Sequence, residues 1–293
     1  MVRLMDGGMG HALYKSVGRP KGGWPATVTI THNKVVQDLH CEFLRAGAEI
    51  ITTNTYNAGR YRLNVKGEAD YFAAINIAAC EAAEAARDAC NPAALIAGAI
   101  GPVRMSYQPD WVPDAAIMEA EVAEQAILLA PYVDFFMIET MSITSEAVAA
   151  VKACSATGRP VWVGYSVEER GDPLLRSGET IQNAVDALDG LPVDAVLINC
   201  TSPEAVSRAL PILRNCLGKD MPFGGYANAF VTIPADFGMG STVADLEQRA
   251  ELGPDAYAGH VAEWLDMGAS IVGGCCEVNP PHIARLAKLI AER

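Results

Sequence analysis

The stretch Ala195-Val196-Leu197-Ile198-Asn199-Cys200 decides the fold of this 293-residue chain. Its apolar residues follow one another without polar side chains between them, which predicts a strand buried on both faces, as in a parallel sheet. The run ends on a polar residue and a thiol, and a helical pattern follows at residues 203–216. A strand that leads into a helix is the repeating unit of α/β folds.

This unit recurs along the whole chain. The apolar runs cover residues 2–7, 49–55, 95–101, 133–140, 160–166, 195–201, 222–228 and 270–276. The helical patterns cover residues 32–46, 68–90, 114–130, 144–157, 179–188, 203–216, 255–267 and 280–292. Eight such units predict a (β/α)₈ TIM barrel, which usually takes about 250 residues. We expect one domain over residues 1–293. A doubly wound sheet is the alternative, but no GxGxxG pattern follows any of the runs.

Composition excludes several classes of partner. The chain is 51% hydrophobic and carries a net charge of −13, which indicates a large core and argues against nucleic-acid binding. No apolar stretch approaches the roughly 18 residues that cross a bilayer, and no secretory signal is visible. We therefore expect a cytoplasmic protein with no membrane partner. The sequence does not indicate the oligomeric state.

The eight cysteines show no spacing typical of a disulfide scaffold. In a reducing cytoplasm most of them are expected to be small apolar core residues with free thiols. This expectation covers Cys41, Cys80, Cys90, Cys154 and Cys216.

The remaining three cysteines stand where predicted strands end. In (β/α)₈ barrels the carboxyl ends of the strands carry the chemistry, and the strands at 195–201 and 270–276 lie two apart in the ring. Cys200 can therefore meet Cys275 and Cys276, which follow the close-packing pair Gly273-Gly274. Three thiolates predict a Zn²⁺ site with one coordination position open, as catalytic zinc sites have.

Two other interpretations of these cysteines remain open. They could be buried apolar thiols, or Cys275 and Cys276 could form a redox pair, although a disulfide between neighbours is strained. If zinc is bound, three thiolates leave the centre with a net charge of −1, which makes it a poor Lewis acid toward carbonyls. It would still stabilise an incoming thiol as thiolate, so the site favours alkyl transfer to sulfur over hydrolysis.

Several motifs, in this order along the chain, resemble those of the zinc-dependent homocysteine S-methyltransferase family. They are Asp6-Gly7-Gly8-Met9-Gly10, residues 46–56 (AGAEIITTNTY), Glu139-Thr140 followed by Glu146-Ala147, Asn199-Cys200, and Gly273-Gly274-Cys275-Cys276 with Pro280-x-His282-Ile283. The resemblance implies a (β/α)₈ barrel with a Cys₃ zinc site. It also implies methyl transfer to L-homocysteine to form methionine, so the partners would be two small molecules, homocysteine and a methyl donor.

The resemblance also implies roles for single residues. Cys200, Cys275 and Cys276 would bind zinc, and Asp6 and Glu139 would hold the ammonium group of homocysteine. The mouth of the site would be lined by Asn54, Thr55 and Tyr56, with backbone amides nearby for the substrate carboxylate. Asn199 and Asn228 are weaker candidates for hydrogen bonds there, and His282 is expected to pack or to cap a helix.

The methyl donor is left open, because His11, Tyr14 and Glu277-Val278-Asn279 depart from the family pattern in the first and last loops. S-methylmethionine, S-adenosylmethionine, betaine or a similar onium compound would fit. Onium groups bind aromatic faces, and four aromatic residues of early loops are candidates for such a cage. They are Trp24, Tyr56, Tyr107 and Trp111.

Two alternative functions keep the same barrel. The acceptor could be another thiol or a selenol, or the barrel could deliver its thiolate to a separate corrinoid partner. The chain ends at Arg293, directly after the last predicted helix, so we expect no corrinoid domain within it. Methionine formation by the purified chain with onium donors alone would separate these alternatives from the main prediction.

Overall fold

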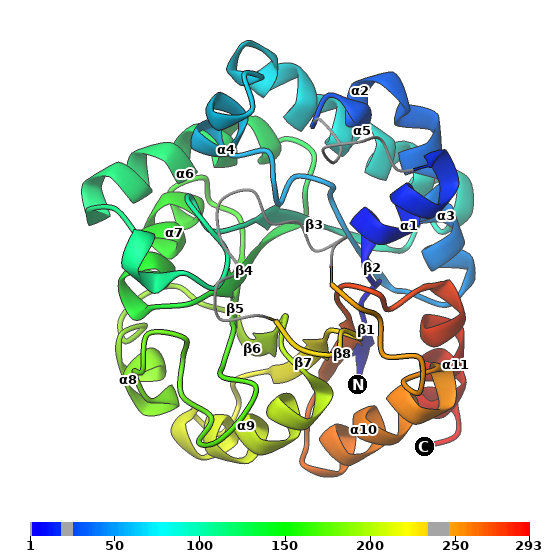
Figure 1. Ribbon diagram of the computed structural model, residues 1–293, viewed down its shortest axis with the longest axis vertical. Coiled ribbons are helices and arrows are strands. Elements are labelled where there is room, and N and C mark those ends of the chain that lie inside the picture. The colour runs from blue at the N-terminus through cyan, green and yellow to red at the C-terminus, as the bar shows by residue number, and fades with distance from the viewer. Residues whose placement is uncertain (1, 19–25, 234–245) are drawn as a thin grey trace.

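The computed structural model describes residues 2–18, 26–233 and 246–293. Eight parallel strands form one sheet in the order β1-β8-β7-β6-β5-β4-β3-β2 (Figure 1). A parallel bridge between Met5 and Ile50 joins the two outer strands and brings the ring almost to closure. The strands are β1 (Arg3–Leu4), β2 (Ile50–Thr52), β3 (Leu95–Ile100), β4 (Phe135–Met141), β5 (Val161–Tyr165), β6 (Ala195–Asn199), β7 (Phe223–Ala227) and β8 (Ile271–Gly274). The predicted (β/α)₈ barrel is confirmed.

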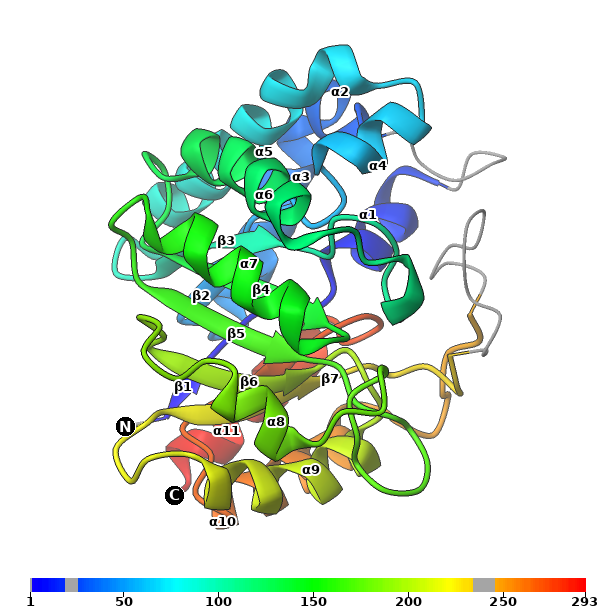
Figure 2. The ribbon, with the colours of Figure 1, turned by 90° about the vertical axis from the view of Figure 1, so that its left-hand side faces the viewer.

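The helices surround this ring, and the arrowheads of β5 and β7 point toward the side that carries long loops (Figure 2). All eight predicted helices are present, with ends shifted by a few residues. They are α3 (Asn33–Arg45), α5 (Phe72–Cys90), α6 (Ala115–Leu129), α7 (Thr144–Ser155), α8 (Ile181–Asp186), α9 (Pro203–Cys216), α10 (Pro254–Asp266) and α11 (Pro280–Ala291). No helix in the described ranges is both long and apolar enough to cross a bilayer.

Sequence patterns missed several short helices in the first loops. They are α1 (Met9–Val17), α2 (Val28–Thr31), α4 (Arg60–Val65) and the 3₁₀ turns Ala69–Tyr71 and Pro109–Trp111. Tertiary contacts hold α2 in place. Glu68, predicted to open a helix, accepts hydrogen bonds from the amides of Ala26 and Thr27 at distances of 2.9 and 3.2 Å. A four-residue helix has no periodicity from which it could be recognised.

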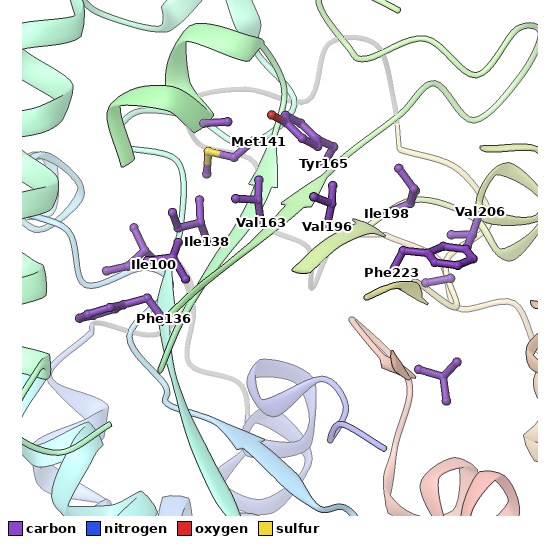
Figure 3. Packing of buried hydrophobic residues seen from close by; sticks show 14 of the residues in the cluster. Ile100, Phe136, Ile138, Met141, Val163, Tyr165, Val196, Ile198, Val206 and Phe223 are labelled. Carbon is purple, nitrogen blue, oxygen red and sulfur yellow. The ribbon is translucent and has the colours of Figure 1, made fainter. Parts of the chain in front are cut away.

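Side chains on the strands point alternately to two layers of the core. Those facing the helices include Phe136, Ile138, Val163 and Val196, which pack into one large cluster (Figure 3). A smaller cluster, containing residues such as Met137 and Leu197, fills the space inside the ring. The barrel interior is therefore packed, and substrates are expected to bind beyond the strand ends.

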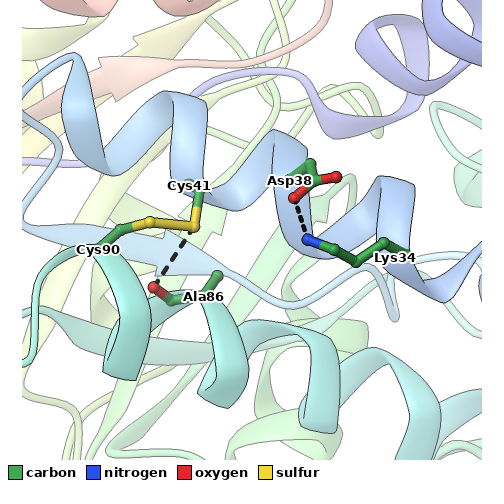
Figure 4. The surroundings of a disulfide bond; sticks show 5 residues. All are labelled: Lys34, Asp38, Cys41, Ala86 and Cys90. Atoms are coloured by element: carbon green, nitrogen blue, oxygen red, sulfur yellow. Dashed lines mark hydrogen bonds and ion pairs between the residues drawn. A yellow bond between two sulfur atoms is a disulfide. The ribbon is translucent and has the colours of Figure 1, made fainter.

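The expectation that Cys41 and Cys90 are free core thiols was wrong. Cys41 on α3 and Cys90 at the end of α5 form a disulfide, 49 residues apart in sequence (Figure 4). The two helices pack side by side, and sequence spacing alone does not reveal that adjacency. The other predicted core cysteines are free, and Cys80 and Cys154 are buried as expected.

Candidate active site

Three thiols meet at the carboxyl end of the barrel. The sulfur of Cys275 lies 3.2 Å from that of Cys200 and 4.0 Å from that of Cys276. All three sulfurs lie within 4.8 Å of one another, and none is in a disulfide. Cys200 follows β6 and the other two follow β8, so the predicted meeting of these strand ends is confirmed.

The segment that ends β7 holds both thiol-bearing loops in place. The amide of Cys275 donates to the carbonyl of Ala227 at 2.9 Å, and the amide of Cys200 donates to that of Tyr226 at 3.2 Å. A Cβ atom on Gly274 would stand 2.0 Å from Cγ1 of Val278, so only glycine allows the chain to turn back this closely. The loop geometry therefore requires the glycine beside the two cysteines.

The electrostatics of the three thiols are those of a cation site. Hydrogen bonds from Cys275 and Cys276 hold the pKa of Cys200 well below its usual value. Cys275 donates a hydrogen bond to that thiolate, and this bond together with burial raises the pKa of Cys275 well above its usual value. Ionisation of Cys200 thus opposes ionisation of Cys275 and Cys276, and a bound cation would remove this opposition. Three sulfur donors this close suit a soft metal ion, so these residues fit a metal centre.

Tyr107 contacts one of these sulfurs directly. Its hydroxyl lies 2.8 Å from Cys200 Sγ, and its backbone has a φ of 66°. Burial and the charge of Cys200 raise the pKa of Tyr107 well above its usual value, so the hydroxyl keeps its proton and donates to the thiolate.

Asp6 and Glu139 are buried carboxyl groups at the same end of the barrel. Asp6 accepts hydrogen bonds from the amide and hydroxyl of Thr52 at 2.8 and 2.9 Å. Glu139 accepts one from the hydroxyl of Tyr226 at 3.0 Å. Burial raises the pKa of Asp6 to about 7, and burial with the charges of Cys200 and Asp6 raises that of Glu139 to about 8. Two such carboxyl groups can bind an ammonium ion, which would offset the cost of their burial.

An irregularity in β4 aims Glu139 into the site. The register between β4 and β5 shifts between Ile138 and Met141, and Thr140 has a φ of 64°. Its amide donates to Asn199 Oδ1 at 3.0 Å instead of to a neighbouring strand. Bulges of this kind re-aim side chains near active sites. Asn199 therefore supports the bulge.

The three predicted residues of the mouth differ in their surroundings. Tyr56 contacts Ser106 through its hydroxyl at 2.7 Å, and the charge of Cys200 contributes to its raised pKa, after burial. Thr55 is buried and donates to the carbonyl of Ala99 at 2.7 Å, whereas Asn54 donates to Thr29 Oγ1 at 3.1 Å. The structure brings Tyr56 close to the thiols and ties the other two side chains to the scaffold. Their roles toward substrate stay predictions.

The described aromatic residues predicted to form a cage for an onium group have different neighbours in the structure. The guanidinium of Arg62 lies 5.4 Å from the ring centroid of Tyr56, and that of Arg176 lies 5.2 Å from that of Tyr107. Trp111 is 42% exposed, and Trp24 lies outside the described residues. Two ring faces predicted to hold an onium ion thus have arginines beside them.

The residues that depart from the family pattern occupy two different elements. His11 and Tyr14 belong to α1, but their side chains lie outside the described part of the chain. Asn279 caps α11 together with His282, so the expected capping role of this histidine is confirmed. Val278 packs against Gly274 next to the cysteines.

Sequence reasoning assigned no role to four residues that the structure places at or next to the site. Tyr226 and Thr140 stand at strand ends, and this position was the available signal for both. Arg62 lies on α4 and Arg176 lies in the loop after β5, and neither position carries such a signal. Asn228, predicted as a weaker candidate for hydrogen bonds, is buried, and neither of its amide atoms has a partner among the described residues. It directly follows β7 and comes two residues after Tyr226, which by strand alternation is the same side of the sheet.

Comparisons with known proteins identify the family of this chain. The sequence model of the family "Homocysteine S-methyltransferase" matches residues 3–290. S-methylmethionine–homocysteine S-methyltransferase BHMT2 of Rattus norvegicus is 29% identical, over 99% of this chain and 78% of that protein. Betaine–homocysteine S-methyltransferase 1 of Bos taurus is 27% identical, over 99% of this chain and 72% of that protein.

Among solved structures, the metallated form of the homocysteine methyltransferase MmuM from Escherichia coli has the same fold. The TM-score is 0.82 at 24% identity, with 98% of this chain and 96% of that chain covered. Because the family model spans nearly every residue, the chain is a methyltransferase and belongs to the homocysteine S-methyltransferase family.

Proposed function

We propose that this protein uses Zn²⁺ to transfer a methyl group from a small onium donor to L-homocysteine, forming methionine. Methyl transfer to homocysteine follows from the family, and the convergence of three cysteine sulfurs within 4.8 Å carries the rest of the proposal. We also propose that residues 1–293 form one homocysteine-binding domain. Its proposed location is the cytoplasm, whose reducing conditions suit the three free thiols but do not favour the Cys41–Cys90 disulfide.

Cys200, Cys275 and Cys276 would hold the zinc ion. When bound, zinc supplies positive charge that lowers the pKa of an incoming thiol and favours its thiolate form. Tyr107 would keep Cys200 in place through its hydroxyl contact at 2.8 Å. The buried amide of Asn228, directly after β7, has no hydrogen-bond partner among the described residues and is a further polar group available to a ligand.

Asp6 and Glu139 would hold the ammonium group of homocysteine. An ammonium ion favours the ionised form of both carboxyl groups, so its binding releases any proton they carry. Thr52 and Tyr226 orient the two carboxyl groups through the hydrogen bonds described above. The sulfur of homocysteine would then be directed toward the thiol cluster. Tyr56, with Asn54 and Thr55 behind it, would border the same mouth.

Methyl transfer from an onium donor needs little further acid–base chemistry. The homocysteine thiolate attacks the methyl carbon in line, and an S–C bond forms as the bond to the donor's positive sulfur or nitrogen breaks. The electron pair of that bond stays with the donor, which becomes a neutral thioether or amine. S-methylmethionine and betaine, named for two relatives, are the leading donor candidates, and S-adenosylmethionine is a third.

A donor panel tests this proposal. The purified, zinc-loaded chain is incubated with L-homocysteine and each of the three donors, without a corrinoid protein, and methionine is measured by mass spectrometry. We expect methionine from at least one donor, loss of the product after chelation of the metal, and recovery on adding zinc. A folded, zinc-loaded chain that forms no methionine from any of the three donors would refute the proposal.

A further inference from the structure

One arginine near the thiols has an unused hydrogen-bond donor. The side chain of Arg176 is only 9% exposed, and its Nη2 is buried without a hydrogen-bond partner among the described residues. A guanidinium remains protonated in proteins, so this buried nitrogen is a charged donor whose hydrogen bonds are not made. Buried charged donors without partners are costly, and each one calls for an explanation.

The position of Arg176 suggests what would satisfy this donor. Its Nε donates to Ser166 Oγ at 3.3 Å, and that hydroxyl donates to the carbonyl of Cys200, also at 3.3 Å. Its guanidinium also lies 5.2 Å from the ring centroid of Tyr107, whose hydroxyl touches Cys200 Sγ. Two separate contact routes thus place the arginine next to the thiol cluster.

Arg62, the other arginine near the site, has no such unused donor. It donates to the carbonyl of Pro102 at 2.9 Å, to Asn57 Oδ1 at 2.7 Å and to Ser106 Oγ at 3.2 Å. These bonds clamp the loops after β2 and β3 together. Arg62 is therefore a scaffold residue, whereas Arg176 has capacity for a ligand.

The charges around Arg176 leave room for an anion. Glu168 forms a loose ion pair with it at 3.7 Å and is 47% exposed. Glu169 lies close enough for Arg176 to lower its pKa, although burial raises that pKa overall, and its carboxylate accepts a hydrogen bond from the amide of Ile233. A guanidinium has five N–H donors, so these neighbours do not exhaust it.

We propose that Arg176 binds the carboxylate of a reactant at the thiol site and thereby selects for amino-acid-like or betaine-like substrates. This inference rests on the proposed function, because it assumes that methyl transfer occurs beside Cys200. Guanidinium and carboxylate match in shape and charge, and the bond is strong where water is excluded. The carboxylate can belong to the methyl donor or to homocysteine, and the experiment separates the two.

Four substrate pairings test the proposal on the zinc-loaded protein. Betaine or S-methylmethionine is compared with its own methyl ester as donor, and homocysteine is compared with 3-aminopropane-1-thiol, which lacks the carboxylate, as acceptor. The wild-type protein should favour one carboxylate-bearing reactant by about 10- to 100-fold in kcat/KM. Arg176→Gln should lose this preference, and Arg176→Lys should keep part of it.

Arg285→Gln is the matched control. Arg285 also has a buried nitrogen without a partner in the described part of the chain, but it lies on α11 and pairs with Asp255 of α10, outside the barrel. This variant should keep the wild-type preferences. Loss of the donor preference in Arg176→Gln assigns the carboxylate to the donor, and loss of the acceptor preference assigns it to homocysteine.

Three results would count against the proposal. If the wild-type protein treats acid and ester alike and both thiols alike, Arg176 recognises no carboxylate. If Arg176→Gln, or Arg176→Lys should the first variant not fold, keeps every wild-type preference, the assignment is equally wrong. If the wild-type protein methylates no thiol with any donor, the proposed function itself fails and this inference fails with it.

Discussion

The two ends of the barrel are built from the same eight strands, but their buried polar groups have different hydrogen-bond partners. At the amino end, Asp134 accepts a hydrogen bond from the amide of Ile96 at 2.7 Å, and Asp194 accepts one from that of Val161 at 2.9 Å. Carboxylates at this end accept hydrogen bonds from backbone amides at the starts of the strands. At the carboxyl end, buried carboxyl groups and thiols crowd together, and within the described ranges the amide of Asn228 has no hydrogen-bond partner.

Backbone strain follows the same division. Among the described residues, four that are not glycine have a positive φ, and each stands in β4 or after a strand at the carboxyl end. They are Tyr107, Thr140, Cys200 and Glu277. Such conformations cost roughly 1–2 kcal/mol each, so that end is assembled at the expense of stability. The polar groups of the amino end therefore stabilise the barrel, whereas those of the carboxyl end are arranged to bind ligands.

The largest expected effect comes from the thiols. Cys275→Ser should remove most of the bound metal and lower activity by about 1,000-fold or more, because two thiolates bind zinc far more weakly than three. Metal content by mass spectrometry and methionine formation are the measurements. Cys216→Ser, at a free cysteine on α9 away from the site, is the control and should change neither. Full zinc occupancy in Cys275→Ser would show that Cys275 is not a zinc ligand, and the carboxyl end would then not be the metal-binding end.

The carboxyl groups come next. Glu139→Gln should raise the KM for homocysteine by about 30- to 1,000-fold while zinc content stays unchanged, because a charge-assisted hydrogen bond to the ammonium is lost. A thiol without an amino group should be affected much less. Equal losses for both thiols would show that Glu139 does not recognise the ammonium. Asp6→Asn should also raise the KM for homocysteine. Its effect should be less specific to the amino group, because Asp6 also accepts a hydrogen bond from Thr52.

The pH dependence of the carboxyl end should be distinctive. The pKa values of Asp6 and Glu139 rise from 3.8 and 4.5 to about 7 and about 8. Because the folded protein holds these protons more tightly than the unfolded chain, the stabilisation they give the metal-free protein is complete below about pH 4. It decreases progressively above about pH 4 and is fully lost once pH has risen through 7 to 8. Chemical denaturation of metal-free protein across this range measures the effect.

Homocysteine binding should depend on pH in the opposite sense. Its ammonium group requires ionised carboxylates, so affinity should increase as pH rises through about 7 to 8. Calorimetric titration with homocysteine, with a thiol lacking the amino group as control, measures this. The same pH profile for both thiols would mean that the two carboxyl groups do not face the ammonium.

The smallest effect is expected at the amino end. Asp194→Ala leaves the amide of Val161 without its partner and should lower the free energy of unfolding by about 1–2 kcal/mol. The KM for homocysteine and the zinc content should not change. Thermal unfolding and steady-state kinetics give the two values. A change in KM of tenfold or more would show that the two ends are not separable in this way.

The features of this molecule that depend on local sequence patterns could be predicted from the sequence. The unbroken apolar runs predicted all eight strands, and the residues that close them predicted that Cys200 would meet Cys275 and Cys276. A residue pair such as Gly273-Gly274 could be interpreted because close packing of the backbone requires glycine. Periodicity and strand ends are local properties, and a single sequence displays them directly.

Other features depend on contacts between distant segments and could not be predicted. The disulfide between Cys41 and Cys90 depends on how α3 packs against α5. The bulge at Thr140 depends on Asn199 of another strand. The unused nitrogen of Arg176 is visible only once its surroundings are known. Each is a property of the packed structure, and none leaves a pattern along the chain.

The central claim is that Cys200, Cys275 and Cys276 bind one zinc ion that keeps a position open for the homocysteine sulfur. X-ray absorption at the zinc edge of the purified protein, before and after addition of homocysteine, tests it most directly. The account predicts three sulfur ligands and one nitrogen or oxygen ligand at first, and four sulfur ligands once homocysteine is bound. Fewer than three sulfur ligands at the start, or an unchanged ligand set after homocysteine is added, would contradict it.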